Sequence, residues 1–341
     1  MKGGVMSKKR MFYVIIALAT FLALNVSLFP TPDVAAEKIT IKAISAWGKN
    51  HSGVTKDYLP YIKRANEMLQ AKYPGEAEIQ YIGGAETIPI PDQPEALRKG
   101  QVDMYYGTAA YYAGVAPAAN TTKLSQLTSQ EEKDVGADAV YDEIHRKLLN
   151  AAYLGALGSQ NPFQLYTIKK ITSPDQIKGL RIRTSPMYVD FLKALGANPV
   201  ATKPGDVYQA LERGVVDGVM WPLDSIRPWG WHEVVKYVTG PPFYKVSHPL
   251  LMNAKKWDSL PKHIQEVLME ALRLEVIAID ARTEQDISNE YKEMKKAGME
   301  VVAFSPEDTK KYLDMAYEEG WKGQLKMEQE YTAKLRKLIS K

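Results

Sequence analysis

The chain has 341 residues, which is enough for two domains of ordinary size with sizeable hydrophobic cores. Its formal net charge of +4 comes mostly from the first 36 residues, so the rest of the chain is nearly neutral and does not indicate nucleic-acid binding. Cysteine is absent, which excludes a disulfide scaffold and a lipid attached to an N-terminal cysteine.

The first 36 residues have the pattern of a secretory signal peptide. Lys8, Lys9 and Arg10 precede the almost entirely apolar residues 11–28, and small residues at 34–36 offer a cleavage site. The alternative is an uncleaved membrane anchor, since the apolar stretch is close to spanning length. The polar residues after the small ones favour cleavage. We therefore expect a mature protein that starts near residue 37 and is exported and released without stable membrane insertion.

Residues 37–108 predict the order strand, helix, strand, helix, strand. Alternating apolar residues indicate strands at 39–44 and 78–82, and helical spacing indicates a helix from Tyr58 to Lys72 between them. A proline-rich loop then leads into A-L-R-K-G-Q-V-D at 96–103, where a helix ends at a glycine and an aspartate opens an apolar strand. This order is typical of a mainly parallel sheet covered by helices.

The second half predicts a similar run of elements. A helix is expected over 131–152, a strand at 180–183, and a helix from Met187 to Leu195 that Gly196 closes. A proline turn then leads into A-L-E-R-G-V-V-D at 210–217. Further on, the spacing predicts an unusually long helix from Pro261 to Ala297 and a final helix that starts at Ser305 and runs toward Leu338.

The phrase Ala-Leu-x-basic-Gly-x-Val-Asp thus occurs twice, at 96–103 and 210–217. Two distant copies of one helix-to-strand step favour two lobes built alike, with a ligand cleft between them. Coincidence is the alternative, because such wording is common at helix ends. The segments directly after the copies differ, and we expect them on opposite walls of the cleft.

Motifs for catalysis and for cofactors are missing. The five histidines do not form the H-E-x-x-H spacing of a zinc site, and the chain has no nucleophile elbow, phosphate-binding loop or dinucleotide fingerprint. Adjacent carboxylates such as Glu131 and Glu132 lie in polar helical stretches and indicate solvated faces. The sequence therefore predicts no catalytic residue, no cofactor and no metal.

Arg183 and Trp221, in the second half, are candidates for binding a ligand. Arg181 and Arg183 alternate along one strand and share a face, and Arg183 stands at the carboxyl end, where α/β sheets bind ligands. A guanidinium group can take a carboxylate through two parallel hydrogen bonds. A surface ion pair is the alternative role for this arginine. Trp221, at the end of the strand after the second copy, is either a wall of the ligand site or ordinary core.

The order of motifs over 173–223 resembles the solute-binding proteins of tripartite ATP-independent periplasmic (TRAP) transporters, the DctP family. The matching segments are 175–183, 196–199, 206–211 and 214–222, and the resemblance extends over nearly the whole mature chain. It implies an α/β, two-lobed periplasmic binding protein, type II-like, with mixed sheets, crossover hinge segments and a long helix that spans both lobes. It also implies a first lobe of residues 37–160 plus 247–286 and a second lobe of residues 161–246 plus 287–341.

The resemblance implies roles for individual residues. Arg183 matches the arginine that pairs with the ligand carboxylate, and Trp221 and Pro204 occupy lining positions. Further ligand contacts are expected from Phe163 in the second lobe and, in the first lobe, from Trp47, Glu86, Gln93, Tyr106 and Thr108. Residues 160–164 lack the second basic residue that some relatives use, which argues against a dicarboxylate. Met220 stands where metal-binding relatives tend to have glutamate, which argues against a metal.

The resulting expectation is a binding protein for a monocarboxylate with an apolar or aromatic body. Lobe closure around the acid would strengthen the arginine contact, and the closed form would deliver the ligand to the TRAP membrane permease subunits. One rival is a receptor for a different transporter or for a sensor. The other is a periplasmic enzyme that acts on a small acid, which would need a general base beside Arg183, and the sequence offers no convincing one.

Overall fold

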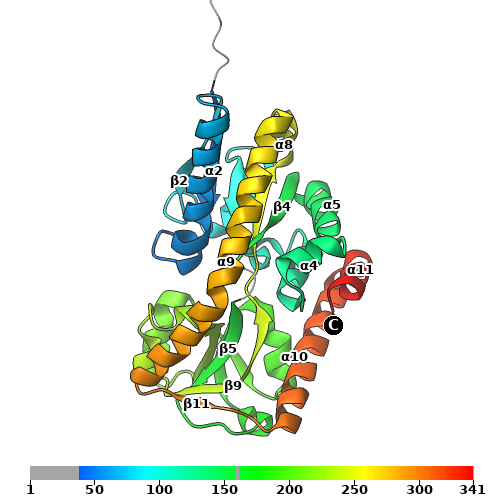
Figure 1. Ribbon diagram of the computed structural model, residues 1–341. Coiled ribbons are helices and arrows are strands. Elements are labelled where there is room, and N and C mark those ends of the chain that lie inside the picture. The colour runs from blue at the N-terminus through cyan, green and yellow to red at the C-terminus, as the bar shows by residue number, and fades with distance from the viewer. Residues whose placement is uncertain (1–37, 159–160, 341) are drawn as a thin grey trace, which may run out of the picture. The chain divides into compact units, whose positions relative to one another are not determined.

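The computed structural model describes residues 38–158 and 161–340, so the predicted signal segment lies outside the described residues. The described chain contains two mixed β-sheets with helices around them, which confirms the expected two-lobed α/β fold class (Figure 1). Each sheet is the centre of one lobe. Across these two ranges, no helix combines the length and the apolar composition needed to cross a membrane.

The first sheet has the strand order β2-β1-β3-β10-β4. The strand β1 pairs in parallel with β2 and β3, whereas β10 runs antiparallel to both β3 and β4. The helices α2 and α3 connect the three parallel strands. The elements are β1 (Ile39–Ser45), α2 (Leu59–Lys72), β2 (Ala77–Gly83), α3 (Gln93–Arg98), β3 (Met104–Tyr106), β4 (Ala151–Leu157) and β10 (His248–Asn253).

The second sheet has the strand order β11-β9-β5-β8-β6-β7. Here β6 pairs in parallel with β7 and β8, and β5 runs antiparallel to both β8 and β9. The strand β11 pairs in parallel with β9. The elements are β5 (Pro162–Thr167), β6 (Arg181–Thr184), α6 (Val189–Ala194), β7 (Asn198–Ala201), α7 (Val207–Glu212), β8 (Gly218–Pro222), β9 (Tyr237–Lys245) and β11 (Glu300–Val302).

The two sheets correspond strand by strand. The parallel trio β2-β1-β3 has the same arrangement as β7-β6-β8, and the next strand in each sheet, β10 or β5, is antiparallel to its trio. Beyond it lies β4 in the first sheet and β9 in the second, where β11 is an additional edge strand. That antiparallel strand, β10 or β5, comes in each case directly after the chain has crossed from the other sheet. These two crossings lie between β4 and β5 and between β9 and β10, and a third, through α9, leads from β10 to β11. A cleft between the lobes is therefore bordered by segments from both halves of the sequence.

The long helix α9 (Lys262–Lys296) contacts elements of both lobes, as expected (Figure 1). It packs against α2 and β4 of the first lobe, and against β11 and the short helix η8 (Leu223–Ser225) of the second lobe. This helix therefore links the two sheets along its length.

The predicted final helix is divided into α10 (Pro306–Met327) and α11 (Glu330–Ile339). The division lies at Glu328, whose backbone is extended and whose carboxylate accepts hydrogen bonds from the backbone N–H groups of Tyr331 at 3.1 Å and Thr332 at 2.9 Å. A carboxylate in this place caps a new helix start. The helix α11 packs against α5 (Ala137–Leu149) and the 3₁₀ helix η4 (Pro117–Leu124), which precede β4 in the chain.

The helix predicted over 131–152 also differs in the structure. Two helices, α4 (Ser129–Asp134) and α5, meet at Gly136, and α5 ends at Asn150, where both residues have positive φ angles of 79° and 49°. The residues that follow form β4, which is buried along its whole length. An apolar run without alternation fits a buried helix and a buried strand equally well, so the spacing could not separate them.

Candidate functional site

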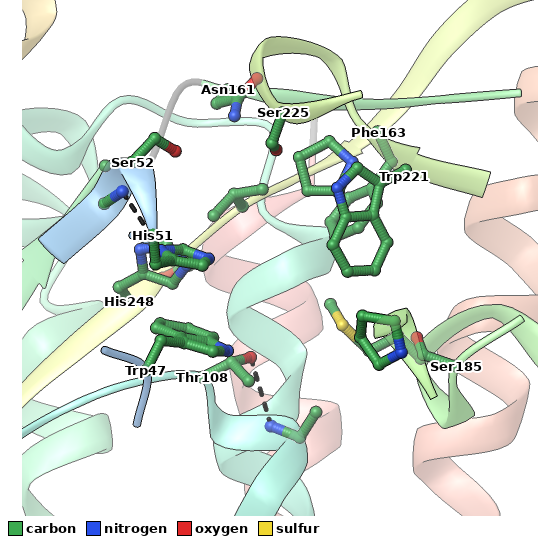
Figure 2. A pocket seen from close by; sticks show the side chains of 18 of the residues that line it. Trp47, His51, Ser52, Thr108, Asn161, Phe163, Ser185, Trp221, Ser225 and His248 are labelled. Carbon is green, nitrogen blue, oxygen red and sulfur yellow. Dashed lines mark hydrogen bonds between the residues drawn. The ribbon is translucent and has the colours of Figure 1, made fainter. Parts of the chain in front are cut away.

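A cavity of about 650 Å³ opens between the two lobes, at the carboxyl ends of the parallel strands. This is the edge of an α/β sheet where ligands usually bind. Aromatic and apolar side chains form most of its wall, and Figure 2 shows Trp47, His51 and His248 of the first lobe across from Trp221 and Phe163 of the second. The cavity has the size and the mostly apolar character of a small-molecule site.

Arg183 lies in the wall from the second lobe. It is 3% exposed, and its Nε and Nη2 both donate to the carbonyl oxygen of Thr202, at 3.1 and 2.9 Å. Its buried Nη1 has no hydrogen-bond partner among the described residues. Because the Thr202 carbonyl occupies one side of the planar guanidinium group, the N–H groups at its far end stay available. A buried cation with unused donors fits an anionic ligand.

Trp221 covers this guanidinium group. The centre of the guanidinium lies 4.9 Å from the centroid of the Trp221 ring, a cation–π distance that fixes both groups. The indole Nε1 is buried and, like Nη1 of Arg183, has no partner among the described residues. Trp229 and Trp231 pack edge-on against the same ring, with centroid distances of 6.3 and 5.0 Å. The second lobe thus offers two adjacent unused donors on a rigid aromatic base.

The wall from the first lobe is built from aromatic rings. Trp47 stacks on His51 at a centroid distance of 4.0 Å and lies 4.9 Å from His248. Its Nε1 donates to the hydroxyl oxygen of Tyr111 at 3.1 Å, which leaves the Tyr111 proton to be donated elsewhere. Burial raises the pKa of Tyr111, whereas the hydrogen bond from Trp47 and the positive charge of Arg183 act in the opposite direction. The Tyr111 hydroxyl therefore lies within electrostatic reach of Arg183 on the other lobe.

Six of the predicted site residues line the cavity together. Besides Arg183, Trp221 and Trp47, they are Phe163, Thr108 and Pro204. Phe163 is held by ring contacts to Tyr188 and Phe243 at 5.6 and 6.3 Å. The sequence motifs thus converge on one cavity, although their members come from strands and loops far apart in the chain.

The structure does not bring Tyr106, Glu86 and Gln93 into the cavity wall. Tyr106 is fully buried behind the wall and stacks on Tyr58 at 4.6 Å. Gln93 is also fully buried, and its amide nitrogen donates to the carbonyl oxygens of Ser45 at 3.1 Å and Ile88 at 2.8 Å, so it holds the proline-rich loop. The Glu86 carboxylate accepts from the backbone N–H of Gly84 at 2.8 Å within the same loop.

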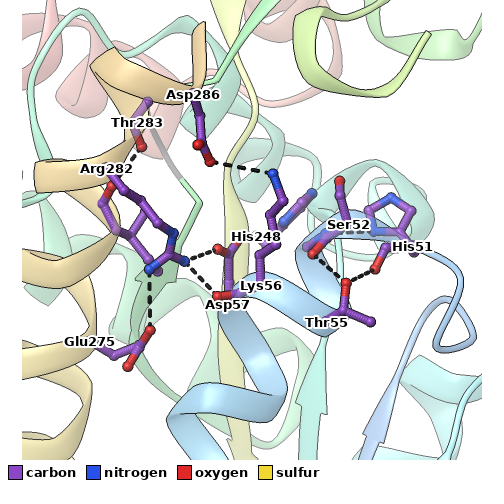
Figure 3. A network of polar contacts seen from close by, with 12 residues as sticks. His51, Ser52, Thr55, Lys56, Asp57, His248, Glu275, Arg282, Thr283 and Asp286 are labelled. Carbon is purple, nitrogen blue, oxygen red and sulfur yellow. Dashed lines mark hydrogen bonds and ion pairs between the residues drawn. The ribbon is translucent and has the colours of Figure 1, made fainter. Parts of the chain in front are cut away.

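Ion pairs at the rim connect the first lobe to α9 (Figure 3). Arg282 donates to Asp57 at 2.6 Å and lies 3.5 Å from Glu275, a carboxylate that is only 2% exposed. Lys56 and Asp286 form a more exposed pair at 3.3 Å. The buried carboxylate needs its cation, while the exposed pair contributes little to stability. These cations already have carboxylate partners, in contrast to Arg183.

Sequence reasoning missed His51, His248, Tyr111 and Trp229, which also line the cavity. His51 could have been found, because it stands in the same loop as Trp47, directly after the first strand. Tyr111 lies shortly after Thr108, in the short helix η3 (Ala109–Tyr112). His248 begins β10, a strand that the sequence did not indicate, so no local signal pointed to it.

The profile of the DctP family, described as bacterial extracellular solute-binding protein, family 7, matches residues 53–324. The 2,3-diketo-L-gulonate-binding periplasmic protein YiaO of Escherichia coli (strain K12) is 24% identical over 296 residues, which cover 84% of this chain and 87% of the relative.

Solved structures are also similar. A TRAP periplasmic solute binding protein from Ochrobactrum anthropi is 25% identical with a TM-score of 0.75, over 89% of this chain and 95% of that one. Another, from Desulfovibrio salexigens with bound orotic acid, has a TM-score of 0.76 at 20% identity, over 89% of this chain and 97% of that one.

Proposed function

The chain belongs to the DctP family of TRAP periplasmic solute-binding proteins, and we propose that it captures a small organic acid with one carboxylate and an apolar or aromatic body. In this proposal the protein works in the periplasm after cleavage of its signal peptide. It hands the acid to the membrane subunits of a TRAP permease, and it performs no chemistry on the acid.

The observation that carries the proposal is Arg183. A buried guanidinium with unused N–H groups is costly unless an acceptor arrives, and a carboxylate supplies two acceptor oxygens in a matching plane. Trp221 Nε1 is a further unused donor beside it. Charge-assisted hydrogen bonds of this kind contribute about 1.5–3 kcal/mol each. In an apolar cavity this attraction is stronger than in water, because the surrounding dielectric constant is lower.

The relatives favour a single carboxylate. The Escherichia coli relative is named for 2,3-diketo-L-gulonate, and the Desulfovibrio salexigens structure holds orotic acid. Each of these acids has one carboxylate on a body that is otherwise uncharged. The cavity of this chain agrees with that chemistry, since its other lysine and arginine residues at the rim are paired, as Lys56 and Arg282 are, or exposed, as Lys203 is.

The test compares two arginines of one strand. Replacing Arg183 with Met keeps a side chain beneath Trp221 but removes the charge and all donors. We expect the affinity for any bound monocarboxylate to fall at least 100-fold, about 3 kcal/mol, because the ligand charge would be buried without a partner. Arg181→Met is the matched control: Arg181 shares the face but is exposed and paired with Asp217 at 2.8 Å.

Calorimetry on a panel of organic acids, after a thermal-shift screen, gives these affinities. An affinity that is unchanged in Arg183→Met, or reduced equally in both variants, would contradict the proposed role of Arg183. Release of a chemically altered acid would contradict pure binding and favour an enzyme.

Lobe closure is the second part of the proposal. An acid that contacts Arg183 on one lobe and Tyr111 on the other stabilises the arrangement in which both are within hydrogen-bond distance, which shifts the population toward it. We expect the radius of gyration measured by X-ray scattering to decrease when a saturating acid is added. In Arg183→Met the same acid should leave the scattering profile unchanged. Identical profiles of the wild type with and without bound acid would refute closure.

A further inference from the structure

A buried polar relay lies behind the first-lobe wall of the cavity. The hydroxyl group of Tyr106 donates to the carbonyl oxygen of Gly53 at 3.1 Å and lies 2.7 Å from Nδ1 of His248. Tyr106 is fully buried and His248 is 7% exposed. The partners come from three distant places in the chain: β3, the turn before the one-turn π-helix η1 (Val54–Tyr58), and the first residue of β10.

The relay determines which nitrogen of His248 carries the proton. A tyrosine hydroxyl has one proton, and the Gly53 carbonyl can only accept. If the Tyr106 proton pointed at His248, the hydroxyl oxygen of Tyr106 and the carbonyl oxygen of Gly53 would face each other at 3.1 Å with no proton between them. Both oxygen atoms are buried, so their lone pairs would repel each other. Both contacts are satisfied when Tyr106 donates to Gly53 and His248 Nδ1–H donates to Tyr106. In that tautomer Nε2 has no proton and is an acceptor.

The Nε2 edge of His248 is the one that faces the cavity. Nδ1 is directed at Tyr106, and the two ring nitrogens point to roughly opposite sides of an imidazole. His248 is a cavity-lining residue, and Figure 2 shows its ring beside those of Trp47 and His51. Burial, together with the neighbouring His51, lowers the pKa of His248 well below its usual range, so the ring stays neutral at physiological pH.

The relay requires a glycine at position 53, because a side chain there would not fit. A Cβ at that position would lie 2.7 Å from the Tyr106 hydroxyl oxygen and 3.1 Å from Cε1 of His248, although the backbone there has an ordinary φ of −59°. A side chain would therefore separate the three groups. The N–H of Gly53 also donates to Nδ1 of His51 at 3.2 Å, so one glycine peptide orients both histidines of the wall.

We propose that His248 is a specificity-determining residue whose unprotonated Nε2 accepts a hydrogen bond from the ligand, so that the site selects acids with a hydroxyl or N–H group on the part that faces the first lobe. This inference rests on the proposed function, in which Arg183 holds the carboxylate. It narrows the ligand from an acid with any apolar or aromatic body to one with a hydrogen-bond donor on that body. A buried acceptor left without a donor disfavours the analogue that lacks the group.

The test uses sets of three acids that differ only at the donor: the hydroxy acid, its deoxy analogue and its methyl ether. Suitable sets are those of 4-hydroxyphenylacetate, mandelate and lactate. The 4-amino analogue of phenylacetate tests an N–H donor in place of the hydroxyl group. For the set that binds the wild type, calorimetry should show the donor form at least tenfold tighter than both other forms. In His248→Phe, which keeps an aromatic ring, this preference should fall to less than threefold, with little change for the deoxy acid.

A second variant tests the relay itself. Tyr106→Phe keeps the imidazole but removes the group that fixes its tautomer, so Nε2 can also present a proton. The preference of the donor form over the methyl ether should then shrink, although His248 is still present. A purely structural role of Tyr106 would weaken all three acids equally. This variant also carries the test if His248→Phe does not fold.

The outcomes separate the two proposals. Acids that need Arg183 but show no preference for a donor, or a preference that survives in both His248→Phe and Tyr106→Phe, would overturn this inference and leave the proposed function standing. Binding that survives in Arg183→Met, or an absence of binding by any acid of the panel, would overturn the proposed function and this inference with it.

Discussion

The helix-to-strand steps at 96–103 and 210–217 make the same hydrogen bonds in the two lobes. Each turns at a glycine with positive φ, 73° at Gly100 and 63° at Gly214. The residue after the glycine bonds back to the first alanine of the phrase, at 2.9 Å in one copy and 2.8 Å in the other. Each aspartate exchanges two bonds with the middle strand of the parallel trio in its lobe: Asp103 with Lys42 of β1 at 2.9 and 2.8 Å, and Asp217 with Arg181 of β6 at 2.7 and 2.8 Å.

The strands beside these steps are different where they reach the cavity. In the register of the two sheets, Ile44 of β1 pairs with Tyr105 as Arg183 of β6 pairs with Val219. The second lobe therefore has its cation where the first lobe has a fully buried isoleucine. Trp221 and Gly107 occupy the same position after the second and the first phrase. At Gly107 the ring of Tyr105 leaves no room for a side chain.

This comparison separates residues that build the fold from residues that line the cavity. The shared residues satisfy the backbone at a helix end and attach the next strand, which any copy of the step must do. In the proposed function the ligand is recognised by residues outside these phrases, and the two lobes contribute different groups. In the second lobe the proposed groups are a charge and an indole on adjacent strands, whereas in the first they are the neutral side chains of His248 and Tyr111, each oriented by a hydrogen bond. Substitutions of the shared residues should therefore change stability, and substitutions of the cavity residues should change ligand affinity.

After Arg183→Met, the largest effect is expected for the aromatic wall of the second lobe. Trp221→Ala removes an aromatic surface of the cavity and a donor beside Arg183. We expect acids with bulky or aromatic bodies to bind about 30-fold more weakly, about 2 kcal/mol, because the indole packs against the body, and short acids to lose less. Calorimetry with one long and one short acid measures the difference.

Trp231→Phe is the control for that variant, since Trp231 packs on Trp221 but is 1% exposed and does not line the cavity. It should reduce stability and leave the ratio of the two affinities unchanged. Equal losses for the long and the short acid in Trp221→Ala would mean that Trp221 acts as core.

The sequence predicted the residues of this site that lie close to a motif. Strand alternation and the resemblance pointed to Arg183, and the strand end after the second phrase and the resemblance pointed to Trp221. The length and position of α9 followed from helical spacing without a break. These features depend on local chemistry, so one chain is enough to predict them.

The rest depends on contacts between distant residues. Tyr106 and His248 are 142 positions apart, and β10 joins the first sheet only after the chain has passed through the second lobe. Nothing local in β10 distinguishes a ligand-facing histidine from a core one. The resemblance implied that Tyr106 contacts the ligand, but its ring lies on the face toward Tyr58. In the proposed relay, Tyr106 orients His248 from behind.

The shared residues should affect stability and not ligand affinity. Asp103→Ala and Asp217→Ala each remove the acceptor of a backbone N–H, and we expect each to lower the free energy of unfolding by about 2 kcal/mol. Asp→Asn at either site keeps an oxygen acceptor and should cost less. Asp217 also pairs with Arg181, but both side chains are partly exposed, at 31% and 47%, so this pair should add less than 1 kcal/mol.

Urea unfolding with and without a bound acid measures both effects. Similar losses of stability with unchanged affinity are expected for the two aspartates. A loss of affinity in Asp217→Ala alone would show that the second copy does more than attach its strand, and would weaken the separation between shared and divergent residues.

The smallest effect is expected at the two glycines. A Cβ at Gly214 would have no atom within 4 Å, and one at Gly100 would have its nearest neighbour, Nδ2 of Asn253, at 3.6 Å. Replacement by alanine therefore costs only the left-handed backbone, about 1 kcal/mol at each site, and the two losses should add because the sites lie in different lobes. Gly114→Ala is the control, since that glycine has open space around it and no positive φ. At both Gly100 and Gly214 a Cβ would meet no close contact, so the two alanine substitutions can differ only in backbone strain. If urea unfolding showed a much larger loss of stability at one of these glycines than at the other, the two helix-to-strand steps would not be equivalent.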